Sequence, residues 1–534
     1  MEKREVLERH FPGIEQFRDI QEPAIDALLE GQRVLCLMPT GGGKSLIYQV
    51  AGLALEKCTL VISPLVALMS QQRDQLVRSG LGAVSFSGMD YRKQFQTLTA
   101  MLQGELPDFV FVSPERIAND GYLEYVLRAR CEDIGLVVVD EAHCVSQWGE
   151  GFRPSYRNIP LALDRIFGDS WPRILCLTAT LNEGQQDQIR EDFRITRTIK
   201  APALWRDNLD LEIVNLRDGK DETKDAELER ILEEHRGEKV LVFVHRKYGK
   251  KGTTRTLDAK YRDRYEGVAH FDSDMSDGEK ASVLQGFTDG SIKIVFATSA
   301  FGMGVDIPDI RVVVNYLISE TIEQYYQEVG RAGRDGKPAK GILLYTRQSR
   351  RGRTRLLGES LCTEGSLRSS WEELGPKRGN TMGCVNYEAL SEEDRASFAL
   401  FVDHDVLRVV AKGVLSLNCF EAVTDEGGRF LSDLYTYARK GMVSIIARKS
   451  GRNVNTLSLD IWRRCSQGDI RMKSSPSKGI FYTFGRELTD EVIQEIVSDQ
   501  EAKKRARVLA FDRFADGIEA GRTAEELVRE ALRI

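Results

Sequence analysis

Short apolar runs, many of them β-branched, recur along the first 345 residues, with longer polar segments between them. The first series is VLCLM (34–38), TLVIS (59–63), FVFVS (109–113), LVVVD (136–140) and ILCLTAT (174–180). The second series is KVLVFV (239–244), VAHF (268–271), IKIVFAT (292–298), VVVNY (312–316) and GILLY (341–345). Continuous apolar runs are typical of parallel strands that helices bury on both faces. The pattern therefore predicts two doubly wound α/β domains, each with a parallel sheet.

The strand rhythm stops after Tyr345, and the polar segment LRDGKDETKDAELER (216–230) is typical of a linker that runs into a helix. A chain of 534 residues is long enough for two to four domains with full cores. We therefore expect tandem RecA-like domains at residues 1–205 and 206–346. Residues 347–534 are expected to form a mixed, mainly helical accessory domain.

The overall charge limits how the chain can meet a polyanion. It has 75 Lys and Arg against 81 Asp and Glu, a net charge of −6. This balance excludes a surface that is basic everywhere, so a nucleic-acid site must be a local patch. The N-terminal MEKREVLERH has no apolar core, and no run approaches the roughly 18 apolar residues of a membrane span. Nine cysteines without a CxxC pair favour a reducing compartment, so we expect a cytoplasmic protein without a membrane segment.

The segment MPTGGGKSLIYQ (38–49) follows a predicted strand and opens a predicted helix, as a phosphate-binding loop requires. The backbone N–H groups of the loop would surround phosphate oxygens, Lys44 would reach the β- and γ-phosphates, and Ser45 would supply an oxygen to Mg²⁺. The expected nucleotide contacts are Thr40, Gly41, Gly42, Gly43, Lys44 and Ser45. The alternative is a glycine-rich turn, and Met38 stands where the generic pattern has glycine.

Two adjacent carboxylates end another strand of the same predicted sheet. Asp140 can hold Mg²⁺, and Glu141 can orient and deprotonate the attacking water. The alternative is a solvated acidic pair, which the upstream phosphate loop makes less favourable. Thr178 and Thr180 end a further strand, either near the nucleotide or as helix caps.

The second domain carries the other half of the expected site. FATSAFGMGVDIPDIR (296–311) joins a glycine-containing turn to Asp306, and YYQEVGRAGRDG (325–336) presents Gln327, Arg331 and Arg334. Arginines three residues apart share one helical face and can reach a phosphate on the opposing domain, as arginine fingers do. The alternative is a solvated basic face, which the neighbouring apolar residues disfavour.

These segments, in order, resemble a superfamily 2 helicase of the RecQ group over about residues 10–345. The resemblance rests on FRDIQ (17–21), MPTGGGKS, VISPLVALMSQQ (61–72), FVSPERI (111–117), DEAHCVSQWGEGFRPSY (140–156), LTAT, FGMGVDIPD and YYQEVGRAGRDG. It implies that Arg18 and Gln21 contact adenine and that His143 couples the two domains. Ile14 stands where the family usually has an adenine-stacking aromatic residue.

In the RecQ group the segment after DEAH is an aromatic-rich loop that senses single-stranded DNA. The resemblance assigns this contact to Trp148, Phe152, Arg153 and Tyr156. Stacking of a base on an aromatic ring contributes about 1–3 kcal/mol without reading sequence, as a motor that steps over any sequence requires. The alternative is that Trp148 and Phe152 belong to the core.

Residues after 346 do not resemble the family's accessory domains. Cys362, Cys384, Cys419 and Cys465 are too scattered for the family's zinc subdomain, so no zinc is expected. YTRQSRRGRTR (345–355) holds five arginines, and residues 439–486 hold eleven Lys and Arg against two carboxylates. We expect Arg463, Arg464, Arg471 and Lys473 to contact DNA, and KSSPSKGIFYTFGR (473–486) to form a basic hairpin in a winged-helix-like module. The alternative is a solvated face, or a surface for a protein partner.

The expected function is that of an ATP- and Mg²⁺-dependent DNA helicase or translocase that acts on single-stranded and forked DNA. The resemblance implies movement in the 3′ to 5′ direction. One alternative is an RNA-directed helicase of the same superfamily. The other is a non-unwinding, nucleic-acid-stimulated ATPase subunit of a larger repair or phage-defence complex, with a protein partner bound through residues 347–534.

Overall fold

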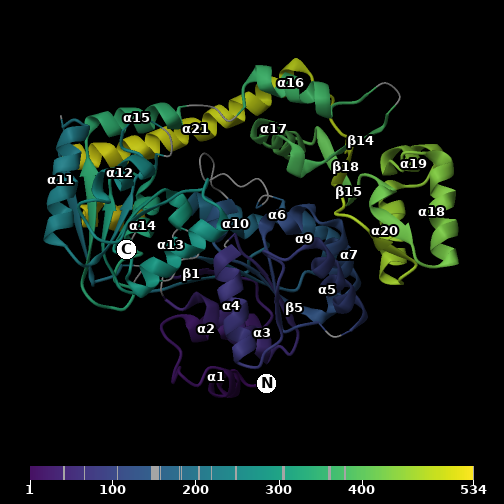
Figure 1. The fold of residues 1–534 in the computed structure, drawn as a ribbon, viewed down its shortest axis with the longest axis horizontal. Coiled ribbons are helices and arrows are strands. Elements are labelled where there is room, and N and C mark those ends of the chain that lie inside the picture. The colour runs from purple at the N-terminus through teal and green to yellow at the C-terminus, as the bar shows by residue number, and fades with distance from the viewer. Residues whose placement is uncertain are drawn as a thin grey trace.

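The structure is a computed structural model of the 534-residue chain. It describes residues 1–39, 42–64, 66–104, 106–145, 156, 158–179, 181, 183–202, 205–217, 219–246, 249, 251–302, 307–358, 362–377 and 380–532. Two α/β domains lie side by side, and the elements after residue 345 run along the top of both and down one side (Figure 1).

The first domain is built on a seven-stranded parallel sheet with the order β3-β4-β2-β5-β6-β1-β7. Its strands are β1 (Val34–Leu37), β2 (Cys58–Ile62), β3 (Ala83–Ser85), β4 (Phe109–Val112), β5 (Ile134–Val139), β6 (Arg173–Thr178) and β7 (Arg197–Lys200). Its helices are α1 (Lys3–His10), α2 (Gln21–Leu29), α3 (Lys44–Ala54), α4 (Val66–Arg78), α5 (Tyr91–Gln103), α6 (Pro114–Asn119), α7 (Gly121–Ala129), α9 (Ile159–Phe167) and α10 (Glu183–Asp192).

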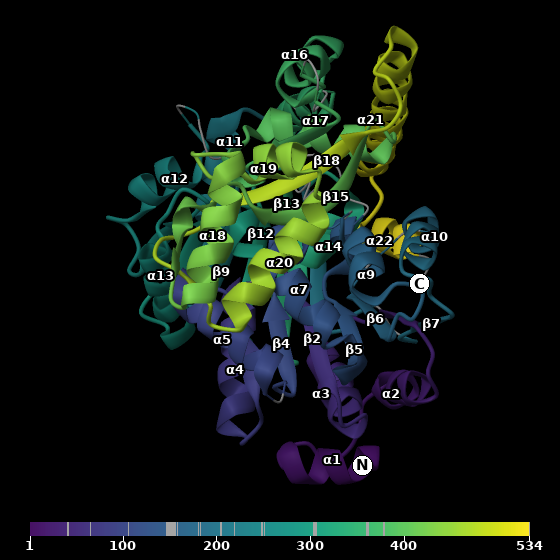
Figure 2. The same cartoon turned by 90° about the vertical axis from the view of Figure 1, so that its right-hand side faces the viewer.

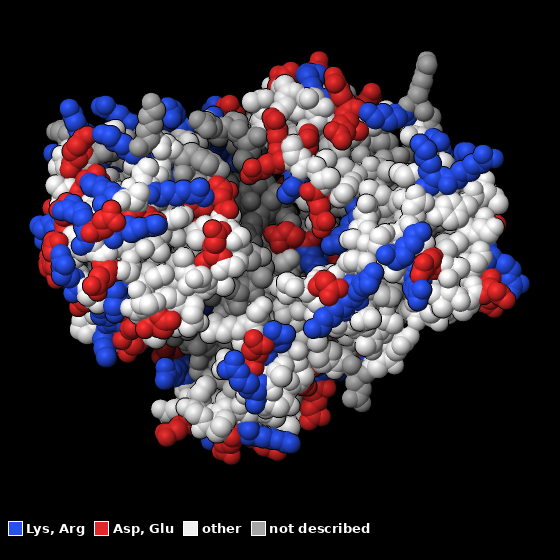
Figure 3. Space-filling model, viewed as in Figure 1, with Lys and Arg blue, Asp and Glu red and all other residues white. Residues whose placement is uncertain are grey.

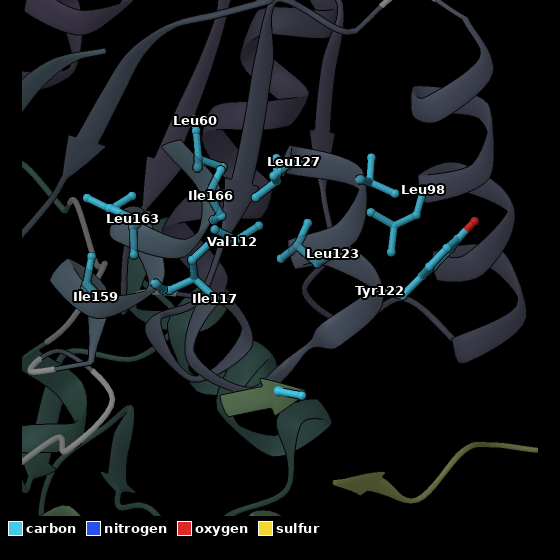
Figure 4. Close-up of a cluster of buried hydrophobic side chains, with 14 of the residues drawn as sticks. Leu60, Leu98, Val112, Ile117, Tyr122, Leu123, Leu127, Ile159, Leu163 and Ile166 are labelled. Atoms are coloured by element: carbon cyan, nitrogen blue, oxygen red, sulfur yellow. The ribbon is translucent and has the colours of Figure 1, made fainter. Parts of the chain in front are cut away.

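Both faces of this sheet are buried, because successive side chains of a strand point to opposite faces. In β5, Leu136 and Val138 join one hydrophobic cluster, whereas Val137 and Val139 join the other. The second cluster lies under α7 and α9, whose inward residues pack on β2 and β4 (Figure 4). The continuous apolar runs of the sequence thus reflect burial from both sides.

The second domain has a six-stranded parallel sheet with the order β10-β11-β9-β12-β13-β8. Its strands are β8 (Leu209–Asn215), β9 (Lys239–Phe243), β10 (Val268–Phe271), β11 (Ile294–Ala297), β12 (Ile310–Asn315) and β13 (Ala339–Tyr345). Its helices are α11 (Asp221–Glu234), α12 (Thr254–Tyr261), α13 (Asp277–Asp289) and α14 (Ile322–Val329). All ten apolar runs of the sequence form strands, and the predicted pair of parallel-sheet domains is confirmed.

The remaining elements are mixed and mainly helical, as expected. The helices are α15 (Arg347–Leu357), α16 (Glu364–Leu374), α17 (Glu392–Asp403), α18 (Asp425–Tyr437), α19 (Val443–Ser450), α20 (Val454–Ser466), α21 (Asp490–Glu519) and α22 (Ala524–Leu532). The strands are β14 (Met382–Val385), β15 (Leu407–Val414), β16 (Phe420–Ala422), β17 (Ile470–Met472) and β18 (Lys478–Phe484).

The predicted basic hairpin at residues 473–486 is wrong. β17 pairs with β16, whereas β18 is the central strand of an antiparallel sheet with the order β14-β18-β15. Ile480 and Tyr482 enter a cluster with α16 and α17, and Phe481 enters the cluster shared with the first domain. A strand buried on both faces cannot serve as an exposed wing. α19 and α20 nevertheless form a helix-turn-helix pair joined at Gly451, Arg452 and Asn453.

The end of the chain returns to the second domain. Phe511, Phe514 and Ile518 of α21 and Leu527 of α22 belong to its hydrophobic cluster. The arginines of α15 face the same helices: Arg350 pairs with Asp512 at 3.0 Å and with Asp516 at 2.8 Å. Part of the positive charge at residues 345–355 is therefore neutralised by ion pairs within the fold. The domain boundaries at 205 and 346 stay a prediction.

The helix-turn-helix pair rests on the first domain (Figure 2). The Trp462 ring of α20 lies 5.1 Å from the Tyr122 ring of α7, and Gln103 Nε2 donates to the Ser466 carbonyl at 2.6 Å. On the neighbouring β15, Lys412 Nζ lies 2.9 Å from Glu124 Oε2. The elements after residue 345 therefore contact both domains. Within the described part of the chain, no helix combines the length and apolar character needed to cross a membrane.

Candidate nucleotide site

The phosphate loop joins β1 to α3 at the carboxyl edge of the first sheet. Gly43 has φ +79°, a left-handed conformation that favours glycine, directly before the helix begins at Lys44. Gln21 Nε2 donates to the carbonyls of Gly42 (3.2 Å) and Gly43 (3.1 Å). A Cβ atom on Gly43 would stand 2.5 Å from that nitrogen. The loop is thus held from behind by α2, and its backbone can approach a phosphate closely.

Asp140 and Glu141 follow β5 at the same edge. The Asp140 carboxylate accepts hydrogen bonds from Ser63 Oγ (3.2 Å) and from the Glu141 backbone N–H (3.0 Å). Glu141 has φ +49°, a strained conformation for a residue with a side chain. Its carboxylate lies 3.8 Å from Lys44 Nζ and 3.2 Å from His143 Nδ1. Strand end and phosphate loop therefore meet, as the sequence predicted.

Burial and nearby charges give the carboxyl groups of Asp140 and Glu141 different pKa values. Burial raises the pKa of Asp140, and the negative charge of Glu141 raises it further. Burial would also raise the pKa of Glu141, but the Lys44 ammonium and the hydrogen bond to His143 hold it well below its usual range. Burial lowers the pKa of His143, but Cys144 and Glu141 together raise it to about 10. Glu141 is therefore ionised at neutral pH, so its carboxylate can accept a hydrogen bond from a water molecule and orient it.

The side chains at this edge fit a magnesium–triphosphate group. Lys44 Nζ is buried without a hydrogen-bond acceptor in the described part of the chain, as a group that awaits phosphate would be. Ser45 Oγ accepts from Gln72 Nε2 at 3.0 Å, and Tyr48 Oη donates to Gln72 Oε1 at 2.8 Å. Carboxylate and hydroxyl oxygens are the ligands that Mg²⁺ prefers. Asp140 and Ser45 could hold the ion.

The second domain brings arginines to this edge. Gln327 lies on α14, and Arg331 and Arg334 follow the helix. Burial and the neighbouring Arg334 lower the pKa of Arg331 to about 10, whereas the charge of Glu141 in the first domain raises it. Arg331 therefore lies within electrostatic reach of Glu141 across the gap between the domains.

Some of the remaining predicted site residues lie among those that the structure describes, and others do not. Arg18 is exposed, and its backbone N–H donates to Gln21 Oε1 at 2.8 Å. Tyr156 is fully buried, and its hydroxyl donates to the Asp140 carbonyl at 2.9 Å. The structure thus links the end of the aromatic-rich loop to the acidic strand end. Thr40, Gly41, Trp148, Phe152, Arg153, Thr180 and Asp306 lie outside the described residues.

The C-terminal basic residues are not brought to the nucleotide edge, and three of the four have acidic partners. Arg463 pairs with Asp460 and Arg471 with Glu421, while Arg464 pairs with Glu426 (3.0 Å) and Asp469 (2.6 Å). Lys473 is exposed. Lys and Arg are interspersed with Asp and Glu over the face drawn in Figure 3.

The four C-terminal cysteines lie in different surroundings. Cys362 is buried against α17, where its thiol lies 3.6 Å from Ser397 Oγ. Cys419 and Cys465 belong to the cluster shared with the first domain, and Cys384 is half-buried on β14. No group of three or more metal-ligating side chains occurs in the ranges that the structure describes.

Sequence reasoning missed Ser63 and Gln72, which support Asp140 and Ser45. Both stand in the segment VISPLVALMSQQ, which contributed to the resemblance without an assigned role. Their signal was a polar residue at a strand end and a glutamine pair on the following helix. Such residues acquire a role only when the sheet order is known.

A phosphate loop and an acidic strand end lie in one parallel-sheet domain, and arginines of a second domain face them, an arrangement suited to binding a nucleoside triphosphate between the domains. Residues 18–189 match the DEAD/DEAH box helicase family, and residues 223–336 match the helicase conserved C-terminal domain. The structure is similar to that of Mycobacterium smegmatis helicase Lhr bound to ssDNA and AMP-PNP, with TM-score 0.50 and 19% identity over 76% of this chain and 58% of that chain. This likeness supports the fold alone.

The sequence comparisons show similarity to RecQ DNA helicases. The chain is 34% identical over 351 residues to the ATP-dependent DNA helicase RecQ of Bacillus subtilis, covering 65% of this chain and 57% of the relative. It is 32% identical over 336 residues to RecQ of Haemophilus influenzae, covering 62% and 52%. The match thus spans about half the length of these relatives. The chain thus carries the two helicase domains that the family models describe, and over these domains it is similar to RecQ DNA helicases.

Proposed function

We propose that this chain is an ATP- and Mg²⁺-dependent DNA helicase of RecQ type. The observation that carries the proposal is the meeting of Lys44, Asp140 and Glu141 at one sheet edge, with Arg331 of the second domain in electrostatic reach of Glu141. Its support from sequence is the 32–34% identity to two RecQ DNA helicases.

In the proposed reaction the first domain binds the nucleotide. The phosphate loop, with Thr40 and Gly41 to Gly43, surrounds the phosphates, and Lys44 binds the β- and γ-phosphate oxygens. Arg18 and Gln21 lie beside adenine. Ser45 and Asp140 would hold Mg²⁺, which would neutralise charge on the phosphates when bound.

Glu141 orients the attacking water and accepts its proton. Arg331 and Arg334 stabilise the charge that develops on the transferred phosphoryl group, with Gln327 and Asp306 from the same domain beside them. His143 lies between Glu141 and Thr178 Oγ1, which is 3.3 Å from His143 Nδ1. From the family resemblance, His143 is proposed to couple the two domains.

Single-stranded DNA is the proposed track, with 3′ to 5′ movement as the expectation from the family. Trp148, Phe152 and Arg153 are proposed to contact the bases and backbone. Tyr156, buried and bonded to the Asp140 carbonyl, connects that loop to the acidic strand end. DNA occupancy would thereby reach the residues that handle water and metal.

A second DNA contact is proposed for the accessory elements. Arg463, Arg464, Arg471 and Lys473 are the candidate residues, and the carboxylates beside the three arginines reduce the field that a fork would meet. A protein partner for the same surface is the alternative, and the cytosol is the proposed compartment.

The ATPase rate with DNA or RNA oligomers tests the proposal. We expect single-stranded DNA to stimulate ATP hydrolysis by the purified chain. We expect Glu141→Gln to abolish this hydrolysis. Stronger stimulation by RNA would favour an RNA-directed helicase. DNA-stimulated hydrolysis without strand displacement would favour a non-unwinding ATPase subunit.

A further inference from the structure

The segment between β7 and β8 joins the two α/β domains, and its Arg206 forms hydrogen bonds to the second domain. Arg206 is half-buried, and its Nη1 donates to the Gly330 carbonyl at 2.9 Å. Its Nη2 donates to the Gly333 carbonyl, and its backbone N–H donates to Tyr326 Oη at 3.1 Å. A single guanidinium therefore binds two carbonyls on either side of Arg331.

The two carbonyls stand at informative positions. Gly330 directly precedes Arg331, and Gly333 directly precedes Arg334. Each carbonyl belongs to the peptide group whose N–H is that of the following arginine, and this peptide group is planar. Arg206 thus fixes the orientation of the backbone immediately before each proposed phosphate-binding arginine.

Asn208 adds further hydrogen bonds to the second domain. Its Nδ2 donates to the carbonyls of Gly333 and Lys337, both at 2.8 Å. Gly333 has φ +58°, and a Cβ atom there would stand 2.6 Å from that amide nitrogen. The close approach therefore requires glycine, and it leaves the loop little room to shift relative to the linker.

Trp205 is held from two sides. Its ring stacks on Tyr326 of α14, with centroids 5.7 Å apart and planes 9° apart. The Arg529 guanidinium of α22 lies 4.6 Å from the Trp205 ring centroid. Trp205 thus packs between α14 and the C-terminal helix, and it joins Arg206 and Asn208 in binding to the second domain.

We propose that Arg206 is a positioning residue, which ties the interdomain linker to the loop of Arg331 and Arg334 and so sets both arginines against the nucleotide when the domains close. The proposal rests on the proposed ATP hydrolysis. Movement of the first domain relative to the second acts on residues 205–208, because they follow in the chain segment that leaves the first domain. A linker bonded to the arginine loop converts that movement into a defined position of the guanidinium groups.

Steady-state ATPase kinetics with saturating single-stranded DNA test the proposal. Arg206→Lys keeps a charge but offers a point donor in place of a planar fork, so it cannot hold both carbonyls in the same geometry. A displacement of about 1 Å can cost on the order of 100-fold in rate. We expect kcat to fall by about that factor, with KM for ATP within about 3-fold because the phosphate loop is untouched. Arg217→Ala is the matched control, since Arg217 follows the same strand β8 and also donates to a carbonyl, that of Glu519.

A double-variant cycle separates positioning from general loss of structure. In an Arg334→Ala background, Arg206→Lys is expected to lose part of its effect on kcat, because one of the two arginines that it positions is gone. A full effect in that background, or an unchanged kcat in Arg206→Lys alone, overturns the inference while the proposed function stands. Absence of ATP hydrolysis in the unaltered chain would overturn the proposed function and this inference with it.

Discussion

Replacement of Lys412 by methionine should loosen the accessory elements from the first domain. Lys412 is only 5% exposed; its Nζ lies 2.9 Å from Glu124 Oε2 and donates to the Ile117 carbonyl at 3.1 Å. Around Lys412 the backbones of β15 and α7 lie in close contact. A Cβ atom on Gly121, the first residue of α7, would stand 2.3 Å from the Lys412 carbonyl oxygen. Burial lowers the pKa of Lys412 to about 8 although Glu124 raises it, so the ammonium is poorly solvated and depends on its partners.

The expected loss of stability depends on how well Glu124 remains paired after Lys412 is replaced. Removal of one partner of a buried ion pair typically costs about 3–5 kcal/mol when the other charge is stranded. Glu124 is not fully stranded, because Arg165 Nε remains 3.2 Å from its carboxylate. We therefore expect the substitution to lower the free energy needed to separate β15 from α7 by about 2 kcal/mol. This value lies near the lower end of the range for a hydrogen bond to a charged group.

Hydrogen exchange in peptides from β15 and α7 measures this cost. A loss of about 2 kcal/mol should speed exchange by roughly 30-fold wherever local opening governs it. Lys449→Met, on the exposed end of α19, is the matched control and should leave both peptides unchanged. Equal exchange in Lys412→Met and the unaltered chain would refute the role of this contact in docking.

Three further predictions concern turnover. Lys44→Ala should weaken ATP binding, whereas Glu141→Gln should bind ATP and hardly hydrolyse it; equilibrium binding and turnover measured together distinguish the two. Arg334→Ala should retain ATP binding and lose about 10³-fold or more in kcat, and a loss below 10-fold would remove it from the proposed role. Trp148→Ala and Arg153→Ala should keep basal ATPase and lose its stimulation by single-stranded DNA, and full stimulation in both would show that the loop is structural only.

The sequence was sufficient for the buried strands and much less so for strands at sheet edges. β5, buried along its whole length, is a continuous apolar run and was predicted. β8 was missed because it lies at an edge, where Asp210 and Glu212 are exposed between Leu209, Leu211 and Ile213. β7 was missed for the same reason, since only Ile199 of its residues is buried. One-sided burial replaces the continuous apolar run by an alternation of apolar and polar residues, which a search for continuous runs does not find.

The nucleotide edge was predictable because its residues stand in contiguous motifs at strand ends. Lys44, Asp140 and Glu141 need only the rule that parallel strands end at one edge. Arg206 could not be found in this way, because its carbonyl partners lie 124 and 127 residues further along the chain. Nothing in the local sequence distinguishes it from a solvated arginine.

Charge counting overestimated the basic character of the C-terminal region. Eleven Lys and Arg between residues 439 and 486 suggested a strong field, but ion pairing depends on residues outside that window. Arg471 pairs with Glu421, and Arg464 pairs with Glu426 as well as with Asp469. The same holds for Arg350, whose acidic partners lie on α21 more than 160 residues later.

Strand displacement by the purified chain is a direct test of the proposed helicase activity. Forked, 3′-tailed and 5′-tailed DNA duplexes with a fluorescent strand would be incubated with ATP and Mg²⁺, with Glu141→Gln as the matched inactive control. We expect release of the labelled strand from forked and 3′-tailed duplexes, none from the 5′-tailed duplex, and none with Glu141→Gln or without Mg²⁺. Hydrolysis of ATP with no strand release from any duplex would contradict the assignment as a helicase.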